Sequence, residues 1–202
     1  MSTLASWLSE GDIRSDGFAN KAAEFILENP QFASDLSAAL DHSDTVVRAH
    51  ATDALEKVAR VRPDLLLPFF DRIRDAAGQE QPPAVRLHLG MIYGHLAVHP
   101  ELRPQLLDAL LQLLDHPGAF SRSWAVTSLC ILGRLEPGLR PGILARIGAL
   151  RNDESIAVRT RVRKAIPLLT DSSSRFPTGW VKCERLRFLG NSPSDDQAGA
   201  TD

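Results

Sequence analysis

The chain has little cysteine and no long apolar run, and each shortage excludes a class of protein. Two cysteines occur among 202 residues, Cys130 and Cys183, and they are far apart without paired spacing. This excludes a disulfide scaffold and a cysteine zinc site. No stretch approaches the ~18 to 20 apolar residues needed to cross a bilayer. Residues 1–14 also lack the basic start and apolar centre of a signal peptide. We therefore expect a cytoplasmic protein without a membrane partner.

A repeated dipeptide is what the chain does contain. The arginines of its four copies are 38, 36 and 37 residues apart, in segments with helical spacing of apolar residues. The copies are Val47-Arg48, Val85-Arg86, Ser121-Arg122 and Val158-Arg159. Recurrence at this period is typical of stacked helical hairpins, in which each unit buries its apolar face only against its neighbours.

Prolines divide each repeat unit into two helices. One proline closes the first helix, and a second lies where the next helix begins, a position that tolerates the missing amide. The closing prolines are Pro63, Pro100 and Pro137, and the opening ones are Pro68, Pro104 and Pro141. In the fourth copy, Pro167 falls inside the first helix, where we expect it to break or kink the last turn.

The predicted domain organisation follows from this period. Residues 16–170 form a repeat domain, preceded by an extension at 1–15. Its units are 16–42, 43–78, 79–115, 116–152 and a partial unit at 153–170. Residues 171–190 form a linker, in which 179–189 are predicted to fold back as a helix that caps the exposed end. Residues 191–202 have few apolar side chains to bury, so we expect a disordered tail.

The units resemble HEAT repeats, in which a loop aspartate shortly precedes Val-Arg and small or aliphatic residues follow. Asp44 and Asp153 fit that pattern, whereas the second unit has Gln79-Glu80-Gln81 in the loop and the third has Ser121 instead of valine. The resemblance covers 16–170. It implies an all-α, right-handed α-solenoid of about four antiparallel hairpins, with the second helices lining a concave, partner-binding surface. It also implies that the repeated arginines bond neighbouring loops.

We found no sequence motif for catalysis or for a cofactor. The chain lacks a Gly-rich phosphate loop and a serine elbow. His88, His95 and His99 share one helix face, but they lack the HExxH glutamate and a further clustered ligand. The matching positions of the next unit hold packing residues, Trp124, Ile131 and Leu135. A packing role is therefore favoured over a metal site, and we predict a protein that is not an enzyme.

The function that we predict is that of a protein-binding scaffold or adaptor. Four arginines of the second helices lie off the apolar stripes and form a ladder that suits an acidic protein partner. These predicted partner-binding residues are Arg72, Arg103, Arg140 and Arg146. The alternative that they are solvated surface charges stays open, because exposed charges are the usual outer face of a helix.

Nucleic-acid binding is the alternative function. Residues 134–188 carry 12 basic and 5 acidic side chains, whereas residues 1–133 carry 11 and 17. The candidate contacts are Trp124, Arg159, Arg161, Arg163 and Lys164, which supply charge and an aromatic ring. These arginines alternate around the helix, so at most two share a face. Some HEAT-like bacterial DNA glycosylases hold damaged DNA with such groups, but their catalytic residues have no match here, and glycosylase activity is not expected.

Overall fold

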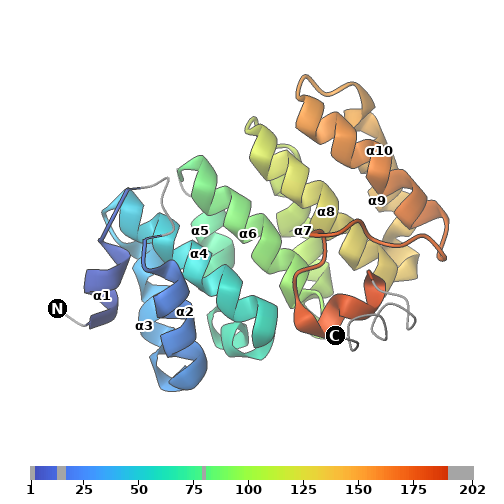
Figure 1. Cartoon of the computed structure of the whole chain (residues 1–202). Helices are drawn as coiled ribbons and strands as arrows, with labels where there is room; N and C mark the ends of the chain where they lie inside the picture. The colour runs from blue at the N-terminus through green and yellow to red at the C-terminus, as the bar shows by residue number, and fades with distance from the viewer. Residues whose placement is uncertain (1–2, 13–16, 79–80, 191–202) are drawn as a thin grey trace, which may run out of the picture.

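The computed structural model describes residues 3–12, 17–78 and 81–190 (Figure 1). These residues form helices and no strand, which confirms the all-α prediction. The α-helices are α1 (Thr3–Leu8), α2 (Ala19–Glu28), α3 (Ala33–Ala38), α4 (Thr45–Val61), α5 (Phe70–Gly78), α6 (Pro83–Leu96), α7 (Arg103–Leu114), α8 (Ala119–Leu135), α9 (Arg140–Ala149) and α10 (Ile156–Thr170). Short 3₁₀ turns join them: η1 (Pro30–Phe32), η2 (Ala39–Asp41), η3 (Pro63–Phe69), η4 (Pro100–Leu102), η5 (Pro137–Leu139), η6 (Leu150–Asn152) and, near the end of the chain, η7 (Glu184–Leu189).

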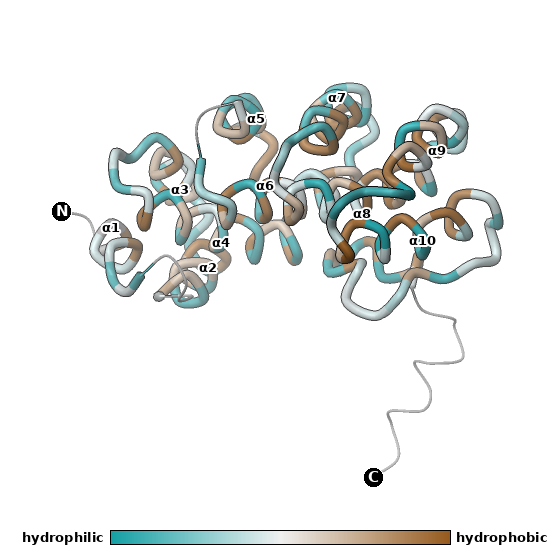
Figure 2. The backbone as a smooth tube through the Cα atoms, turned by 90° about the horizontal axis from the view of Figure 1, so that it is seen from above, coloured by the Kyte–Doolittle hydropathy of each residue, from teal (hydrophilic) through white to brown (hydrophobic). Residues whose placement is uncertain are grey.

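The helices of the repeat domain stand in two curved rows (Figure 2). The first helices of the hairpins, α2, α4, α6 and α8, form one row with α10, and the second helices, α3, α5, α7 and α9, form the other. The row of first helices lies on the inside of the curve, and we call it the inner row; the other is the outer row. The prediction that the second helices line the concave surface is therefore wrong.

Small residues explain this curvature. Neighbouring inner-row helices pack directly on one another, whereas outer-row helices contact each other much less. At Gly94 of α6, an added Cβ atom would lie 2.5 Å from the Ser128 hydroxyl of α8. That hydroxyl donates a 2.6 Å hydrogen bond to the carbonyl of Gly90. Backbones that approach so closely shorten the inner side of the stack, while a cavity of about 280 Å³ remains between α7 and α9 of the outer row.

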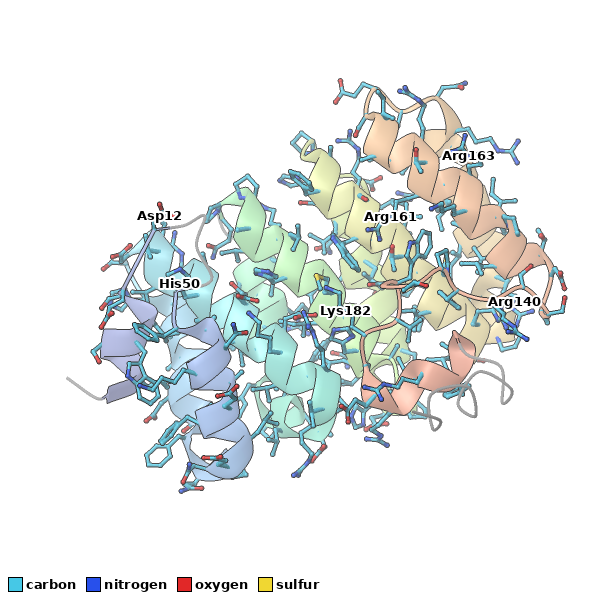
Figure 3. All side chains as sticks on the ribbon, in the orientation of Figure 1. Asp12, His50, Arg140, Arg161, Arg163 and Lys182 are labelled. Carbon is cyan, nitrogen blue, oxygen red and sulfur yellow. The ribbon has the colours of Figure 1, made fainter. Side chains whose placement is uncertain are left out.

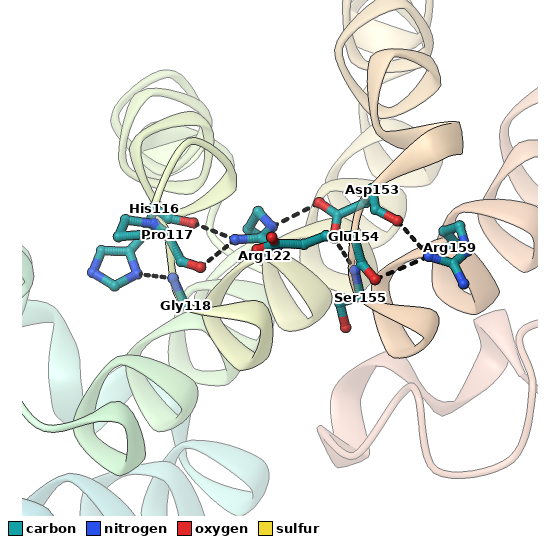
Figure 4. A network of polar contacts seen from close by, with 8 residues as sticks. All are labelled: His116, Pro117, Gly118, Arg122, Asp153, Glu154, Ser155 and Arg159. Carbon is teal, nitrogen blue, oxygen red and sulfur yellow. Dashed lines mark hydrogen bonds and ion pairs between the residues drawn. The ribbon is translucent and has the colours of Figure 1, made fainter.

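Two of the repeated arginines, Arg48 and Arg122, join successive loops, as the resemblance implies; Figure 4 shows Arg122. Arg122 donates to the carbonyls of His116 and Pro117 in its own loop, and it grips both carboxylate oxygens of Asp153 in the next loop at 2.8 and 2.9 Å. Its hydrogen bonds to Asp153 raise the pKa of Arg122. Burial tends to raise the pKa of the Asp153 carboxyl, but hydrogen bonds from Arg122 and the Ser155 amide hold it below its usual value.

The first copy of the arginine makes the same bonds with a different acceptor. Arg48 donates to the carbonyls of His42 and Ser43, and its Nε donates to the Gln81 side chain of the next loop at 2.9 Å. Asp44, the loop aspartate of the first unit, caps α4 by accepting from the Val46 amide at 2.8 Å. The glutamine of the atypical second loop therefore takes the place that Asp153 has for Arg122.

The end of the domain differs from the prediction in two ways. Helix α10 continues through Pro167 to Thr170 without a break, because the following Leu168 and Leu169 are buried in the core. Residues 171–190, which we call the C-terminal strap, form no α-helix: the strap is irregular up to Cys183 and ends in the 3₁₀ turn η7. The predicted tail at 191–202 lies outside the described residues.

The strap covers the inner row instead of the end of the stack (Figure 1). It runs back across this row, so that η7 contacts α4, and it buries five apolar side chains on the way. These are Phe176, Trp180, Cys183, Leu186 and Leu189. Arg134 of α8 holds the start of the strap through the carbonyls of Ser172 and Ser174, at 2.7 and 2.6 Å. The strap thus becomes part of the concave surface.

Candidate functional site on the inner row

One column of side chains points to the concave surface from four successive inner-row helices. It consists of the residues two positions after each repeated arginine, namely His50, His88, Trp124 and Arg161. His50 holds the N-terminal segment, because its ring nitrogens lie 2.9 Å from the carbonyl of Leu8 and 3.1 Å from that of Asp12 (Figure 3). The other three lie under or beside the strap. The N-terminal end of the column is therefore occupied by the protein's own N-terminal segment, and its C-terminal end has side chains that a ligand can reach.

The middle of the inner row holds buried charges that pair with one another. Glu56 of α4 is fully buried, 3.0 Å from Nε2 of His95 and 2.5 Å from Nη2 of Arg60. Burial raises the pKa of the Glu56 carboxyl, but the hydrogen bonds from His95 and Arg60 outweigh burial and lower it to about 2. The carboxylate therefore stays ionised and is engaged within the protein.

The three histidines singled out in the sequence do not converge. His88 lies 3.6 Å from Asp53, His95 contacts Glu56, and His99 is 3.7 Å from Glu101. Burial lowers the pKa of His88 and that of His99. Within residues 3–12, 17–78 and 81–190, no group of three or more His, Cys, Asp or Glu side chains is placed to hold a metal ion. Each histidine lies beside its own carboxylate.

A pocket of about 420 Å³ opens between α8 and α10. We call it the α8–α10 pocket; its walls combine aromatic, cationic and hydroxyl side chains. It is lined by Leu87, Phe120, Ser123, Trp124, Ala157, Thr160, Arg161, Lys164 and Trp180. The guanidinium carbon of Arg161 lies 4.3 Å from the ring centre of Trp124 and 5.0 Å from that of Trp180, so this cation contacts a ring of α8 and a ring of the strap.

The described residues supply no acidic partner to the cations of this pocket. Arg161 donates a hydrogen bond to the Thr127 hydroxyl, and within the described part of the chain it contacts no carboxylate. Lys164 is exposed and forms no ion pair there. Lys182 of the strap lies beside the pocket, 5.3 Å from the Trp124 ring centre. Burial lowers the pKa of both Arg161 and Lys182, and at Lys182 the charges of Glu56 and Asp53 oppose this effect.

The structure divides the residues predicted for nucleic-acid binding. Trp124, Arg161 and Lys164 line the α8–α10 pocket together. Arg159 instead donates to the carbonyls of Asp153 and Glu154, and Arg163 lines a different cavity on another face of α10 (Figure 3). Sequence reasoning missed Trp180 and Lys182 as neighbours of this site. No local pattern signals them, because they reach the site only through the course of the strap.

The four second-helix arginines lie on the outer row, and each has a partner within the chain. Arg72 pairs with Asp41 at 3.2 Å and Arg146 with Asp115 at 2.6 Å, each bridging to the preceding unit. Arg103 pairs with Glu136 of the next unit at 3.2 Å. Arg140 donates to the Gly133 carbonyl at 2.8 Å and to the Ser172 hydroxyl at 3.1 Å. All four thus bond to other parts of the chain, and their role in partner binding stays a prediction.

Comparison with known proteins places this architecture among repeat proteins. An engineered protein solved by the Northeast Structural Genomics Consortium matches with a TM-score of 0.60 and 17% identity, over 83% of this chain and 79% of that one. A designed armadillo repeat protein in complex with the peptide (KR)4 matches with a TM-score of 0.55 and 14% identity, over 82% and 80%. The chain has an α-solenoid fold. Identities this low show the fold alone.

Sequence comparisons add no family to this result. No protein-family model and no curated protein matches the chain. Among the described residues of the solenoid, no helix combines the length and the apolar character that a membrane span requires.

Proposed function

We propose that the chain is a non-enzymatic interaction scaffold whose inner row holds an extended segment of a partner protein. The observation that carries this proposal is the strap, because the protein already places an irregular, non-helical segment of its own against this row. Trp180 and Lys182 of that segment contact α8 and α10 side chains of the row. Beside the strap, the α8–α10 pocket leaves part of this row open.

The structural neighbours support this proposal at the level of the fold. The designed armadillo repeat protein was solved with a bound peptide, and repeat solenoids offer extended concave surfaces to their partners. Each complete unit of this chain has two main helices, so we assign it to the HEAT-like rather than the three-helix armadillo type of solenoid. The resemblance of the arginine-containing loops to those of HEAT repeats supports the same assignment.

Affinity purification of the tagged protein from its host, with and without nuclease, tests the proposal. We expect stoichiometric recovery of a protein that survives nuclease. Leu87→Lys places a charge at a half-buried site in the middle of the inner row, where a long side chain reaches solvent without unfolding the helix. This variant should lose the partner. Retention of the partner by a folded Leu87→Lys protein would show that it binds elsewhere.

The outer-row arginines provide the contrasting surface. Charge reversal at Arg72, Arg103, Arg140 and Arg146 tests whether they also contact the partner, as the sequence predicts. Arg151→Glu, at an exposed site that belongs neither to the strap nor to these four arginines, is the control for added negative charge. If the four reversals leave partner recovery unchanged while thermal melting shows a folded protein, these arginines serve only to bond parts of the chain to one another.

Nucleic-acid binding is a second candidate function. The observation that favours it is the gathering of Trp124, Arg161 and Lys164 at one pocket, where an aromatic ring and two cations lie within reach of a single ligand. Backbone phosphates bind cations in a salt-dependent way, and bases stack on aromatic rings. Partners that disappear from the purification after nuclease treatment would support this candidate over the protein-binding one.

A further inference from the structure

The cations of the α8–α10 pocket are placed to receive an anion from outside the protein. Arg161 and Lys164 are three residues apart on α10, so their side chains lie on the same face of this helix. A guanidinium that is largely shielded from water is normally paired with a carboxylate. No carboxylate of the described residues pairs with Arg161, which donates instead to the Thr127 hydroxyl. The described part of the chain therefore offers no carboxylate to these two cations.

An aromatic platform stands at the edge of this pocket. Phe120 is 62% exposed, which is unusual for a side chain of its size and apolar character. It is four residues before Trp124 on α8, so both rings line the pocket from the same face of that helix. An exposed ring beside two cations suits a planar ligand that stacks while its anionic group reaches the cations.

Two hydroxyl groups indicate what kind of planar ligand fits. The side chains of Ser123 and Thr160 line the pocket from opposite walls, and within the described residues neither hydroxyl has a hydrogen-bond partner. A hydroxyl donates and accepts, so it matches the polar edge of a nucleobase or the hydroxyls of a sugar. A plain phenyl ring, such as that of phosphotyrosine, would leave both groups without a partner.

We propose that the α8–α10 pocket binds one nucleoside phosphate unit, with its base on Phe120 and its phosphate on Arg161 and Lys164. The pocket volume of about 420 Å³ falls within the range of small-ligand sites. The unit is either a free nucleotide or part of a single strand, since both present the same base and phosphate. This inference deepens the second candidate function and rests on it.

Tryptophan fluorescence gives a direct test of this proposal. Trp124 and Trp180 lie at the pocket, whereas Trp7 lies on α1 and contacts Phe25 of α2, so a Trp7→Phe background reports on the pocket alone. Adenosine monophosphate and an oligodeoxythymidylate strand are the two probes, with phosphotyrosine and inorganic phosphate as comparison ligands. We expect saturable quenching by at least one nucleotide probe and weaker binding of both comparison ligands.

Three single variants locate the binding. Phe120→Ala and Lys164→Met should each lower the affinity for the nucleotide probe by about tenfold or more, because each removes one stacking or one phosphate contact. Arg163→Met removes the same charge from the same helix but from outside the pocket, and it should change affinity little. All three sites are exposed, so melting temperatures close to that of the parent protein are expected.

The outcomes separate this proposal from the function on which it rests. Mononucleotide binding without strand binding would support the pocket and remove the nucleic-acid candidate. Strand binding that is insensitive to Phe120→Ala and Lys164→Met would support that candidate and overturn the pocket. Phosphotyrosine binding as tight as nucleotide binding would overturn the choice of ligand, and the absence of quenching by both nucleotide probes would overturn the proposal.

Discussion

At the scale of single residues, the repeated arginine is informative because it joins two loops at once. The side chains of Arg122 and Asp153 are only 8% and 6% exposed. Water therefore cannot replace either charged group as the partner of the other. The resemblance to HEAT repeats, carried by the repeated dipeptide and the loop aspartate, implied this role. It did not predict that Gln81 would accept from Arg48, because a single sequence does not show which side chain of an atypical loop turns inward.

Arg122→Ala should destabilise the protein more than the equivalent substitution of the last repeat. Removing the guanidinium leaves the Asp153 carboxylate buried without its partner, which we expect to cost about 3 kcal/mol of unfolding free energy. Arg159→Ala removes only hydrogen bonds to exposed loop carbonyls, and its cost should stay below about 1 kcal/mol. Urea unfolding of the two variants measures both values. Equal costs would contradict the pairing described for Asp153.

Glu56 should make the stability depend on acid pH. Its folded-state pKa of about 2 lies below the ordinary value of 4.5, so its stabilising effect is present above pH 4.5 and is lost as the pH falls towards 2. A shift of this size corresponds to about 3 kcal/mol. The unfolding free energy of Glu56→Gln should therefore fall less over this window than that of the parent protein. If the unfolding free energies of the two proteins change in parallel with pH, the pKa of Glu56 is not strongly lowered in the folded protein.

At the scale of elements, the strap is the part of the fold that the sequence did not predict. Periodicity identifies residues that share a helix face, and it placed His50, His88, Trp124 and Arg161 in one column. Periodicity does not show which segment covers that column. The apolar residues of 179–189, with their spacing of three, predicted a helix that folds back over the exposed end, whereas the strap is irregular and ends in the 3₁₀ turn η7. Burial of Trp180 and Leu186 on the inner row determines its course instead.

Trp180→Ala should loosen the strap from the inner row. The indole is 6% exposed and contacts Phe176 and Arg161, so its removal should cost about 3 to 5 kcal/mol of unfolding free energy. Thr178→Ala, at an exposed position of the strap, is the matched control, with an expected change below about 0.5 kcal/mol. Thermal and urea unfolding measure both variants. A small cost at Trp180 would mean that the strap is only loosely attached.

At the scale of the whole molecule, the uneven charge of the chain has a structural counterpart. The strap carries cations from the basic part of the sequence back to the acidic part: Lys182 lies near Asp53 and Glu56, and Arg185 near Asp64. Some of the positive charge of 134–188 is thus offset within the protein. At the α8–α10 pocket, Arg161 and Lys164 have no carboxylate partner among the described residues, a distinction that totals of basic and acidic residues do not reveal.

The repeat period and the proline positions were sufficient to predict the α-solenoid and the hairpin of each unit. They were insufficient to predict the direction of curvature, which depends on how closely neighbouring helices approach. Gly94 against Ser128 is one contact that brings the inner row together. In sequence, these two residues belong to different units, and their contact follows only from the stacking.

Hydrogen exchange of the protein with its purified partner tests the central claim most directly. If the inner row is the partner surface, binding should slow amide exchange in α4, α6, α8 and the strap, and leave α5, α7 and α9 nearly unchanged. Slowed exchange that is confined to the outer-row helices would contradict the account, and it would return the partner site to Arg72, Arg103, Arg140 and Arg146.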